Sequence, residues 1–180
     1  METTTESVQP FIQEGEIQTP FMVYTSQGII WGKLPHSELI QASRILLGVT
    51  IPEYVYLVEA QALFLEPNFA AKPVRHSQMM VPTNTVLGFN LMPPEKDQLD
   101  YDPTEPNRKM SPVTLYMGPL VVKGNLRISE ITNVKTTVEV TKADFITLYD
   151  IEVSHPNNPK MSPIRSNMGH FRLNQLLIAE

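Results

Sequence analysis

Cysteine is absent from this sequence of 180 residues. Its absence excludes disulfide bonds, thiolate nucleophiles and cysteine-ligated zinc sites. Glycine is scarce, and its eight residues all occur singly, so the chain has no glycine-rich loop of the kind that cradles phosphates. Long apolar runs are absent too, since none approaches the roughly 20 residues that cross a bilayer. The acidic start also lacks the features of a secretory signal, and we therefore expect a cytoplasmic protein without membrane insertion.

The chain also has no surplus of basic residues, because it contains 19 acidic and 14 basic residues and its net charge is −5. A negative charge opposes binding to a phosphate backbone. The surplus acids are unevenly placed. Residues 1–20 hold four acids and no base, and residues 93–112 hold five acids and three bases, whereas residues 21–92 are balanced and 113–180 carry one more base than acid. The acidity therefore belongs to two connecting segments, and the net charge alone does not exclude a nucleic-acid partner.

Proline, by contrast, is abundant, with 16 residues, and this disfavours long helices. Its densest cluster lies in residues 93–112, where five prolines are mixed with acidic residues. Because proline fixes φ and lacks an amide donor, this segment is predicted to be an extended, semi-rigid linker. The chain is thereby divided into an acidic N-terminal arm (1–20), a first repeat (21–92), a Pro-rich linker (93–112) and a second repeat (113–180).

The two longer segments resemble one another in sequence. Tyr24 and Gly32 match Tyr116 and Gly124 at an offset of 92 residues, and later matches follow at offsets of 91 and 90. The three stretches together give twelve identities over roughly 70 positions, and other pairs exchange like for like. The preserved order indicates an internal duplication. The alternative is that two β-rich halves share the same alternating pattern.

Each half has the strand pattern of a small antiparallel barrel. Two apolar runs around a short turn predict an opening hairpin, and a long strand and a closing hairpin follow. These elements are expected at 21–34, 54–65 and 78–89 in the first half and at 113–126, 145–153 and 169–178 in the second. Gly32 and Gly124 occupy equivalent strand positions, where glycine typically marks a bulge or sharp bend. Residues 37–47 have the only helical pattern, since their counterpart 129–140 is rich in Thr and Val and is predicted to be strand.

About five short strands in roughly 70–80 residues suit a barrel, whose closure removes edge strands. The predicted fold class is therefore mainly β, with two tandem small antiparallel β-barrels and little helix. Three stretches of the second half resemble the Sm-like family: the glycine-containing strand 121–126, the strand 144–152 and the hairpin about Asn174. The resemblance extends as a pattern to the first half. It implies Sm-like barrels, assembly into rings and, in many members, binding of single-stranded RNA.

The RNA-binding signature of the Sm-like family matches this chain only in part. That signature places Asp and Asn in one loop and Arg-Gly with Asn in another. Ile164-Arg165-Ser166-Asn167 fits partly, Val74-Arg75-His76-Ser77 fits less well, and neither contains the Arg-Gly pair. Arg75 and Arg165 hold matching positions. They are therefore candidate contacts for RNA or another anion, or else arginines that lie along the barrel and pair with an acid.

Residues for catalysis or metal binding are not grouped in the sequence. The four histidines share no metal-ligand spacing; they are His36, His76, His155 and His170. Asp97, Asp100 and Asp102 lack the glycine and terminal glutamate of an EF-hand and lie among prolines. A Gly-x-Ser-x-Gly nucleophile motif is also missing. We therefore expect no catalytic residue, no metal and no cofactor, and a protein that is not an enzyme.

Two hypotheses for the function follow. The first is a non-enzymatic structural or assembly protein whose duplicated barrels mediate self-association as a homo-oligomer or docking in a larger complex. Trp31 and Phe89 are its candidate interface residues, because aromatic side chains are enriched at interfaces, although burial in a core would also explain them. The alternative is an Sm-like RNA-binding regulator with a basic patch in the second half. That patch would comprise Lys123, Arg127, Lys135, Lys142 and Arg165.

Overall fold

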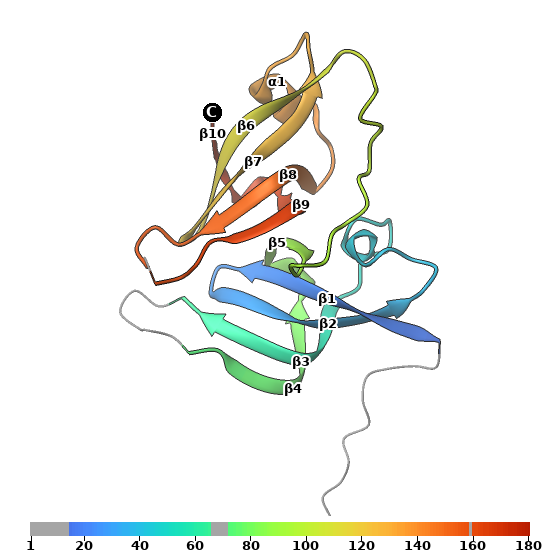
Figure 1. The fold of residues 1–180 in the computed structure, drawn as a ribbon, viewed down its shortest axis with the longest axis vertical. Helices are drawn as coiled ribbons and strands as arrows, with labels where there is room; N and C mark the ends of the chain where they lie inside the picture. Colours follow the sequence, from blue (N-terminus) through green and yellow to red (C-terminus); the bar gives the residue numbers. More distant parts are fainter. Residues whose placement is uncertain (1–14, 66–71, 159) are drawn as a thin grey trace, which may run out of the picture.

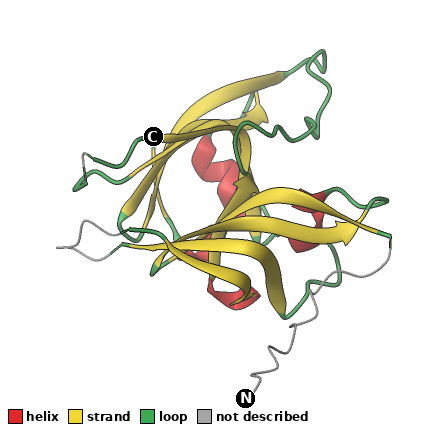
Figure 2. Cartoon of the chain, turned by 60° about the horizontal axis from the view of Figure 1, so that its bottom comes forward, coloured by secondary structure: helices red, strands yellow, loops and turns green. Residues whose placement is uncertain are grey.

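Ten β-strands in one antiparallel sheet make up most of the residues that the structure describes. The structure is a computed structural model, which describes residues 15–65, 72–158 and 160–180. The sheet order is β10-β6-β7-β8-β9-β5-β1-β2-β3-β4. The strands are β1 (Glu16–Thr25), β2 (Gly28–Ser37), β3 (Tyr54–Phe64), β4 (Val74–Pro82), β5 (Val86–Leu91), β6 (Arg108–Met117), β7 (Leu120–Ser129), β8 (Phe145–Ser154), β9 (Ile164–Arg172) and β10 (Leu177–Ala179). The predicted mainly β class is confirmed, and Figure 2 shows how strands dominate over helix.

The sheet consists of two five-stranded units that follow one another in the chain. Strands β1 to β5 form the first unit and β6 to β10 the second, and in each unit the fifth strand pairs with the first. In Figure 1 the second unit lies above the first, and the connection from β5 to β6 runs along one side. β1 begins at Glu16 and β6 at Arg108, so strands start within the segments that the sequence assigned to the arm and the linker.

The two units have coinciding hydrogen-bond registers. The ladder of β1 and β2 recurs as that of β6 and β7 with every partner moved by 92 residues, so that Glu16↔Ser37 becomes Arg108↔Ser129. The ladder of β3 and β4 recurs as that of β8 and β9, with offsets of 91 and 90. Matching registers over four strands are what an internal duplication predicts.

The fifth strands carry one further shift, so that their offset is 89 rather than the predicted 90. Phe89 of β5 lies opposite Val23 of β1, and Ile178 of β10 lies opposite Leu115, the counterpart of Val23 in β6. Phe89 and Ile178 are therefore structural counterparts. By the same count, Leu177 is the counterpart of Gly88.

Both units bend at the glycine that the sequence singles out. The ladder between β2 and β3 is irregular at Gly32, and that between β7 and β8 is irregular at Gly124. A Cβ on Gly32 would lie 2.8 Å from the carbonyl oxygen of Val58, so the chains could not approach so closely with another residue there. On the facing strands Glu59 and Asp150 both have a φ of 50°. The predicted bend is confirmed in both units.

The strands do not close into two barrels in the described residues. β5 pairs with β1 and with β9, not with β4, so the two-barrel architecture stays a prediction. The predicted closing hairpin of each half is wrong. A 3-10 helix separates its strands, η2 (Thr83–Thr85) in the first unit and η3 (Leu173–Gln175) in the second. The buried Thr83 holds this turn, because its hydroxyl donates to the carbonyl oxygen of Pro52 at 2.7 Å.

The prediction of helix is wrong in position. Residues 37–47 contain only a 3-10 helix, η1 (Ala42–Leu46), whereas α1 (Val134–Val140) forms in the stretch predicted to be strand. Asn133 caps α1, because its side chain accepts a hydrogen bond from the amide of Thr136 at 2.8 Å. This cap and the packing of the buried Val134 outweigh the strand preference of Thr and Val.

The hydrophobic core has two clusters, and each cluster contains residues from both units. One cluster belongs mainly to the second unit, and it also contains Met22, Tyr24, Ile29 and Leu87 of the first. The other belongs to the first unit and contains Phe145 of the second. Since side chains cross the boundary in both directions, each unit completes part of the core of the other.

Candidate assembly interface

A seam between β5 and β9 joins the two units. In this antiparallel pair Phe89 lies opposite His170, and Gly88 lies opposite Phe171. A Cβ on Gly88 would lie 2.5 Å from the Phe171 ring and 3.1 Å from the carbonyl oxygen of His170, so glycine permits the close approach. The seam continues the hydrogen-bonded ladder from one unit into the next.

Phe89 is at the centre of the aromatic packing along the seam. Its ring centroid lies 5.0 Å from that of His170 and 5.2 Å from that of Phe145. The Nδ1 atom of His170 is within hydrogen-bond distance of the Thr147 hydroxyl, at 3.0 Å. Burial lowers the pKa of His170 to about 4. The imidazole is therefore neutral at neutral pH, which suits its place against an aromatic ring.

Tyr24, in β1 of the first unit, packs against the second unit. Its ring stacks on that of Phe171, with 6.4 Å between the centroids. Its hydroxyl donates to Oδ1 of Asn90 at 2.7 Å, and Asn90 itself is fully buried. Burial raises the pKa of the Tyr24 phenol. The hydroxyl therefore remains protonated and serves as a donor inside the core.

Arg172 fastens the end of β9 to the first unit. Its Nε donates to the carbonyl oxygen of Val86 at 2.9 Å, and Nη2 donates to that of Thr83 at 3.0 Å. The guanidinium carbon also lies 4.6 Å from the centre of the Phe145 ring. One side chain thus satisfies two backbone acceptors across the boundary, at the turn that precedes β5.

The linker between β5 and β6 is anchored to both units. The Ser43 hydroxyl, in η1, donates to the Asp97 carboxylate at 3.0 Å, and burial raises the pKa of Asp97. The Asn167 side chain, in β9, exchanges hydrogen bonds of 2.8 and 3.2 Å with the Asp97 backbone. Further along, the Tyr149 hydroxyl donates to Asp100 at 2.6 Å. The linker therefore holds the two units together by hydrogen bonds to both, in addition to connecting them along the chain.

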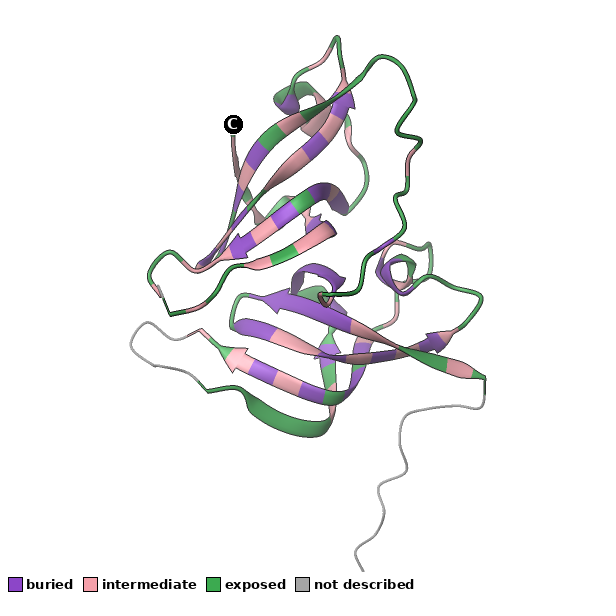
Figure 3. Ribbon diagram, in the orientation of Figure 1, coloured by how far each residue is buried: buried purple, intermediate pink, exposed green. Residues whose placement is uncertain are grey.

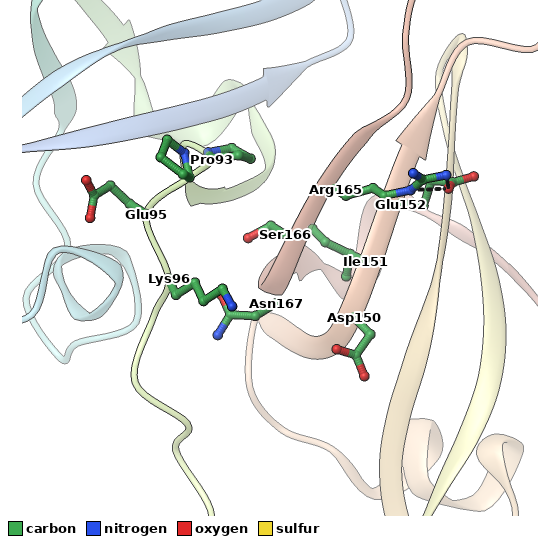
Figure 4. A pocket seen from close by; sticks show the side chains of 10 residues that line it. Pro93, Glu95, Lys96, Asp150, Ile151, Glu152, Arg165, Ser166 and Asn167 are labelled. Atoms are coloured by element: carbon green, nitrogen blue, oxygen red, sulfur yellow. Dashed lines mark hydrogen bonds and ion pairs between the residues drawn. The ribbon is translucent and has the colours of Figure 1, made fainter.

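A cleft of about 510 Å³ lies between the linker and strands β8 and β9. Figure 4 shows Glu95 and Lys96 on its linker side and Asp150 and Arg165 on its strand side. Arg165 is held by Glu152, to whose carboxylate Nε and Nη2 donate at 2.8 and 2.7 Å. Because the lining mixes acids and bases, the cleft favours no ligand of a single charge.

The two strands of the seam have counterparts at the outer edges of the sheet. By register, β9 corresponds to β4 and β5 corresponds to β10. In the described part of the chain β4 pairs only with β3, and β10 only with β6. Figure 3 shows that β5 is buried along its length whereas β4 is largely exposed. An edge strand presents backbone donors and acceptors with which another chain can pair.

Side chains that are buried at the seam have exposed counterparts at the outer edges. Tyr24 is 0% exposed, whereas its counterpart Tyr116 is 46% exposed. His170 is 1% exposed, whereas its counterpart Met80 is 50% exposed. Leu177, the counterpart of the buried Gly88, is 73% exposed. Each unit therefore shows, on its outer side, a version of the surface that the other unit contributes to the seam.

An apolar groove of about 390 Å³ lies beside β4. Its walls include Leu63 and Phe64 of β3 and Met79 and Met80 of β4, and residues 25–28 of the first turn line it as well. Apolar grooves next to an open sheet edge fit a partner that adds a strand, because backbone pairing and side-chain burial then occur together.

The sequence-predicted site residues lie in different places. Phe89 is at the seam, and Trp31 is half-buried against the second-unit cluster. Arg75 is exposed in β4 opposite Gln61, and Arg165 holds the equivalent place in β9 opposite Glu152. The structure therefore places Phe89 at the seam and Trp31 against the second-unit cluster, and it pairs Arg165 with an acid.

Several bases of the predicted basic patch also have acidic partners. Arg127 Nη2 lies 2.6 Å from a Glu105 carboxylate oxygen, and Lys135 Nζ lies 3.8 Å from one of Glu139.

Within the described residues no group of three or more His, Asp or Glu side chains is placed to hold a metal ion. The Asp102 carboxylate accepts hydrogen bonds from the amide and the hydroxyl of Thr104, and these bonds stabilise the local turn.

Sequence reasoning missed the seam contacts of Arg172 and the outer-edge residues Met80, Tyr116 and Leu177. One signal was present, because Tyr24 and Tyr116 are identical residues at an offset of 92. Neither residue could be assigned to a surface before the sheet order was known.

Comparison with known proteins gave no match to a family model, to a curated protein or to a solved structure. Among the described residues, none of the helices has the length and apolar character needed to cross a membrane.

Proposed function

We propose that the protein is a non-enzymatic assembly protein, whose copies join edge to edge through β4 and β10. The seam between β9 and β5 is the observation that supports this proposal. The chain already contains one junction of this kind, and its two strands are the counterparts of the two outer edges. A second copy could therefore extend the sheet at either end by repeating a contact that the sequence has evolved once.

The chemistry of the edges also supports pairing. Natural edge strands are usually protected by charges, by proline or by short length. β4 has nine residues, and its only Lys, Arg, Asp or Glu is Arg75, near one end. The other end carries Met79, Met80 and Val81, beside the apolar groove. This half of β4 has no charged side chain, and its one proline, Pro82, is the last residue of the strand, beyond the positions proposed to pair.

The proposed contact joins two different surfaces, one from each copy. Such a heterologous contact closes into a ring when the rotation between copies allows it, and otherwise grows into a filament. The Sm-like resemblance favours a ring. Both arrangements need the same pairing of β10 with β4, so both are forms of the same function.

Sedimentation velocity on matched variants tests the proposal. Leu177→Asp places a charge on β10, whereas Leu39→Asp makes the same change at a residue that is 94% exposed and belongs to neither edge strand. We expect the wild type and Leu39→Asp to sediment as multiples of 20.4 kDa and Leu177→Asp to sediment as single copies. A wild type that remains a single copy at about 100 µM, or a Leu177→Asp variant that assembles normally, would refute it.

A further inference from the structure

We infer that the groove beside β4 receives Tyr116 of a second copy of this chain, in a register that sets Ile178 opposite Met80 and Leu177 opposite Val81. This inference rests on the proposed function and adds the partner, the register and the anchoring side chain. Its basis is that the internal seam is an example of the contact, in which two residue pairs define the register. At the outer edges Leu177 replaces Gly88, and the smaller Val81 replaces Phe171, whose ring a Cβ at Gly88 would meet.

The register follows from the seam and the two offsets. At the seam, Phe89 faces His170 and Gly88 faces Phe171. The counterpart of Phe89 is Ile178, at an offset of 89, and that of His170 is Met80, at an offset of 90. Repeating the seam between two copies therefore sets Ile178 of one copy against Met80 of the other. A slip by one residue would turn each of these side chains to the opposite face.

Tyr116 fits the groove by the same correspondence. At the seam Tyr24 stacks on Phe171, whose first-unit counterpart is Val81. Val81 is smaller than Phe171, and a groove lies beside it, with Phe64 and Met80 partly exposed in its walls. A tyrosine ring brought to the equivalent position would lie against Val81 and occupy this groove, whereas Ile178 would cover Met80 on the opposite face of the strand. Aromatic side chains seated in apolar pockets are the usual anchors of protein interfaces.

The turns between the first two strands agree with this placement. At the seam a Cβ on Gly118, in the turn of the second unit, would lie 3.9 Å from Cα of Ser26, in the turn of the first. Ser26 and Gly118 are themselves counterparts, at an offset of 92. The repeated contact therefore brings Gly118 of the second copy to Ser26, which lines the groove. Edge, groove and turn all indicate the same docked position.

Disulfide trapping tests the register directly, because the chain has no cysteine of its own. Met80→Cys chains are mixed with Ile178→Cys chains and oxidised. Directly opposed residues in antiparallel strands have Cα atoms about 4.5–5.5 Å apart, within the range of a disulfide. A partner two residues along lies about 7–8 Å away, so Gln78→Cys mixed with Ile178→Cys is the matched control. We expect a covalent dimer in the first mixture, at least about tenfold more than in the control or in either chain alone.

Variants of Tyr116 test the anchor in the same assay. Tyr116→Ala should lower the yield of trapped dimer by at least about tenfold, whereas Tyr116→Phe, which keeps the ring, should leave it unchanged. If wild-type copies assemble in sedimentation but the control pair traps as well as the predicted pair, the inferred register is wrong and the proposed function stands. If Tyr116→Ala traps normally, the anchor is wrong. If wild-type copies do not assemble at all, both proposals fail.

Discussion

Replacing Tyr24 and Tyr116 by phenylalanine compares the same change at two counterpart positions. Tyr24→Phe removes the hydroxyl that donates to Asn90 at 2.7 Å, and Asn90 is fully buried. Its Oδ1 would then lack that donor, and an unsatisfied buried acceptor costs about 1–3 kcal/mol. Tyr116 is 46% exposed in the single chain, so Tyr116→Phe should change the free energy of unfolding by less than about 0.5 kcal/mol.

Urea denaturation followed by the fluorescence of the single tryptophan, Trp31, measures both variants. Trp31 packs against the cluster that contains Tyr24, so its emission reports on this region. The protein concentration should be low enough to keep copies apart. In a separate thermal melt followed by the same emission, a chain of this size should lose about 2–4 °C of melting temperature for each kcal/mol by which Tyr24→Phe destabilises it. Equal effects of the two substitutions would refute the assignment of Tyr24 to a buried, hydrogen-bonded place at the seam.

Three further predictions concern the seam. Gly88→Ala should destabilise the fold by about 1–3 kcal/mol in urea denaturation, because its Cβ would meet the ring across the seam at 2.5 Å, whereas Gly48→Ala, with its nearest contact at 3.6 Å, should be nearly neutral. The pKa of His170 is about 4 in the fold against 6.5 when unfolded, so the unfolded chain binds a proton first and stability should fall as the pH drops from about 6.5 to 4. At about 1.4 kcal/mol for each unit between the two pKa values, the loss approaches about 3 kcal/mol. His170→Met should flatten that part of the profile in stability measurements against pH and His76→Met should not, and a retained slope in the former would contradict the assignment. Arg172→Lys should cost about 1–2 kcal/mol in thermal melts, because one ammonium cannot reproduce the hydrogen bonds of the guanidinium to two carbonyl oxygens, and an unchanged melting temperature would contradict this.

Local patterns predicted most strands and both bends. Alternating apolar runs and short turns are properties of neighbouring residues, so both opening hairpins were predicted, at 21–34 and 113–126, although the observed hairpins are longer and span 16–37 and 108–129. Gly32 and Gly124 indicated the bends because only glycine permits such close backbone approach. The helix at Val134–Val140 was missed because Thr and Val favour strands, and the Asn133 cap that decides the outcome is a single residue.

Long-range pairing could not be read from the same patterns. A run such as 78–89 has the signature of a hairpin, but its two strands pair with different neighbours after a 3-10 turn. The candidate site depends on this difference, because it sends β5 to the seam and leaves β4 at the outer edge. Phe89 was a candidate by residue type alone. Met80 and Tyr116 became candidate interface residues only when the sheet order showed that their counterparts are buried.

We expect copies of this chain to continue one sheet by repeating the internal seam. This assembly can be examined in a structure of the wild-type protein, determined by electron cryomicroscopy at a resolution that separates strands. We predict an unbroken ladder from one copy to the next, with β10 antiparallel to β4 and Ile178 opposite Met80. Copies joined through any other surface, or particles that contain one chain only, would rule out this mode of assembly.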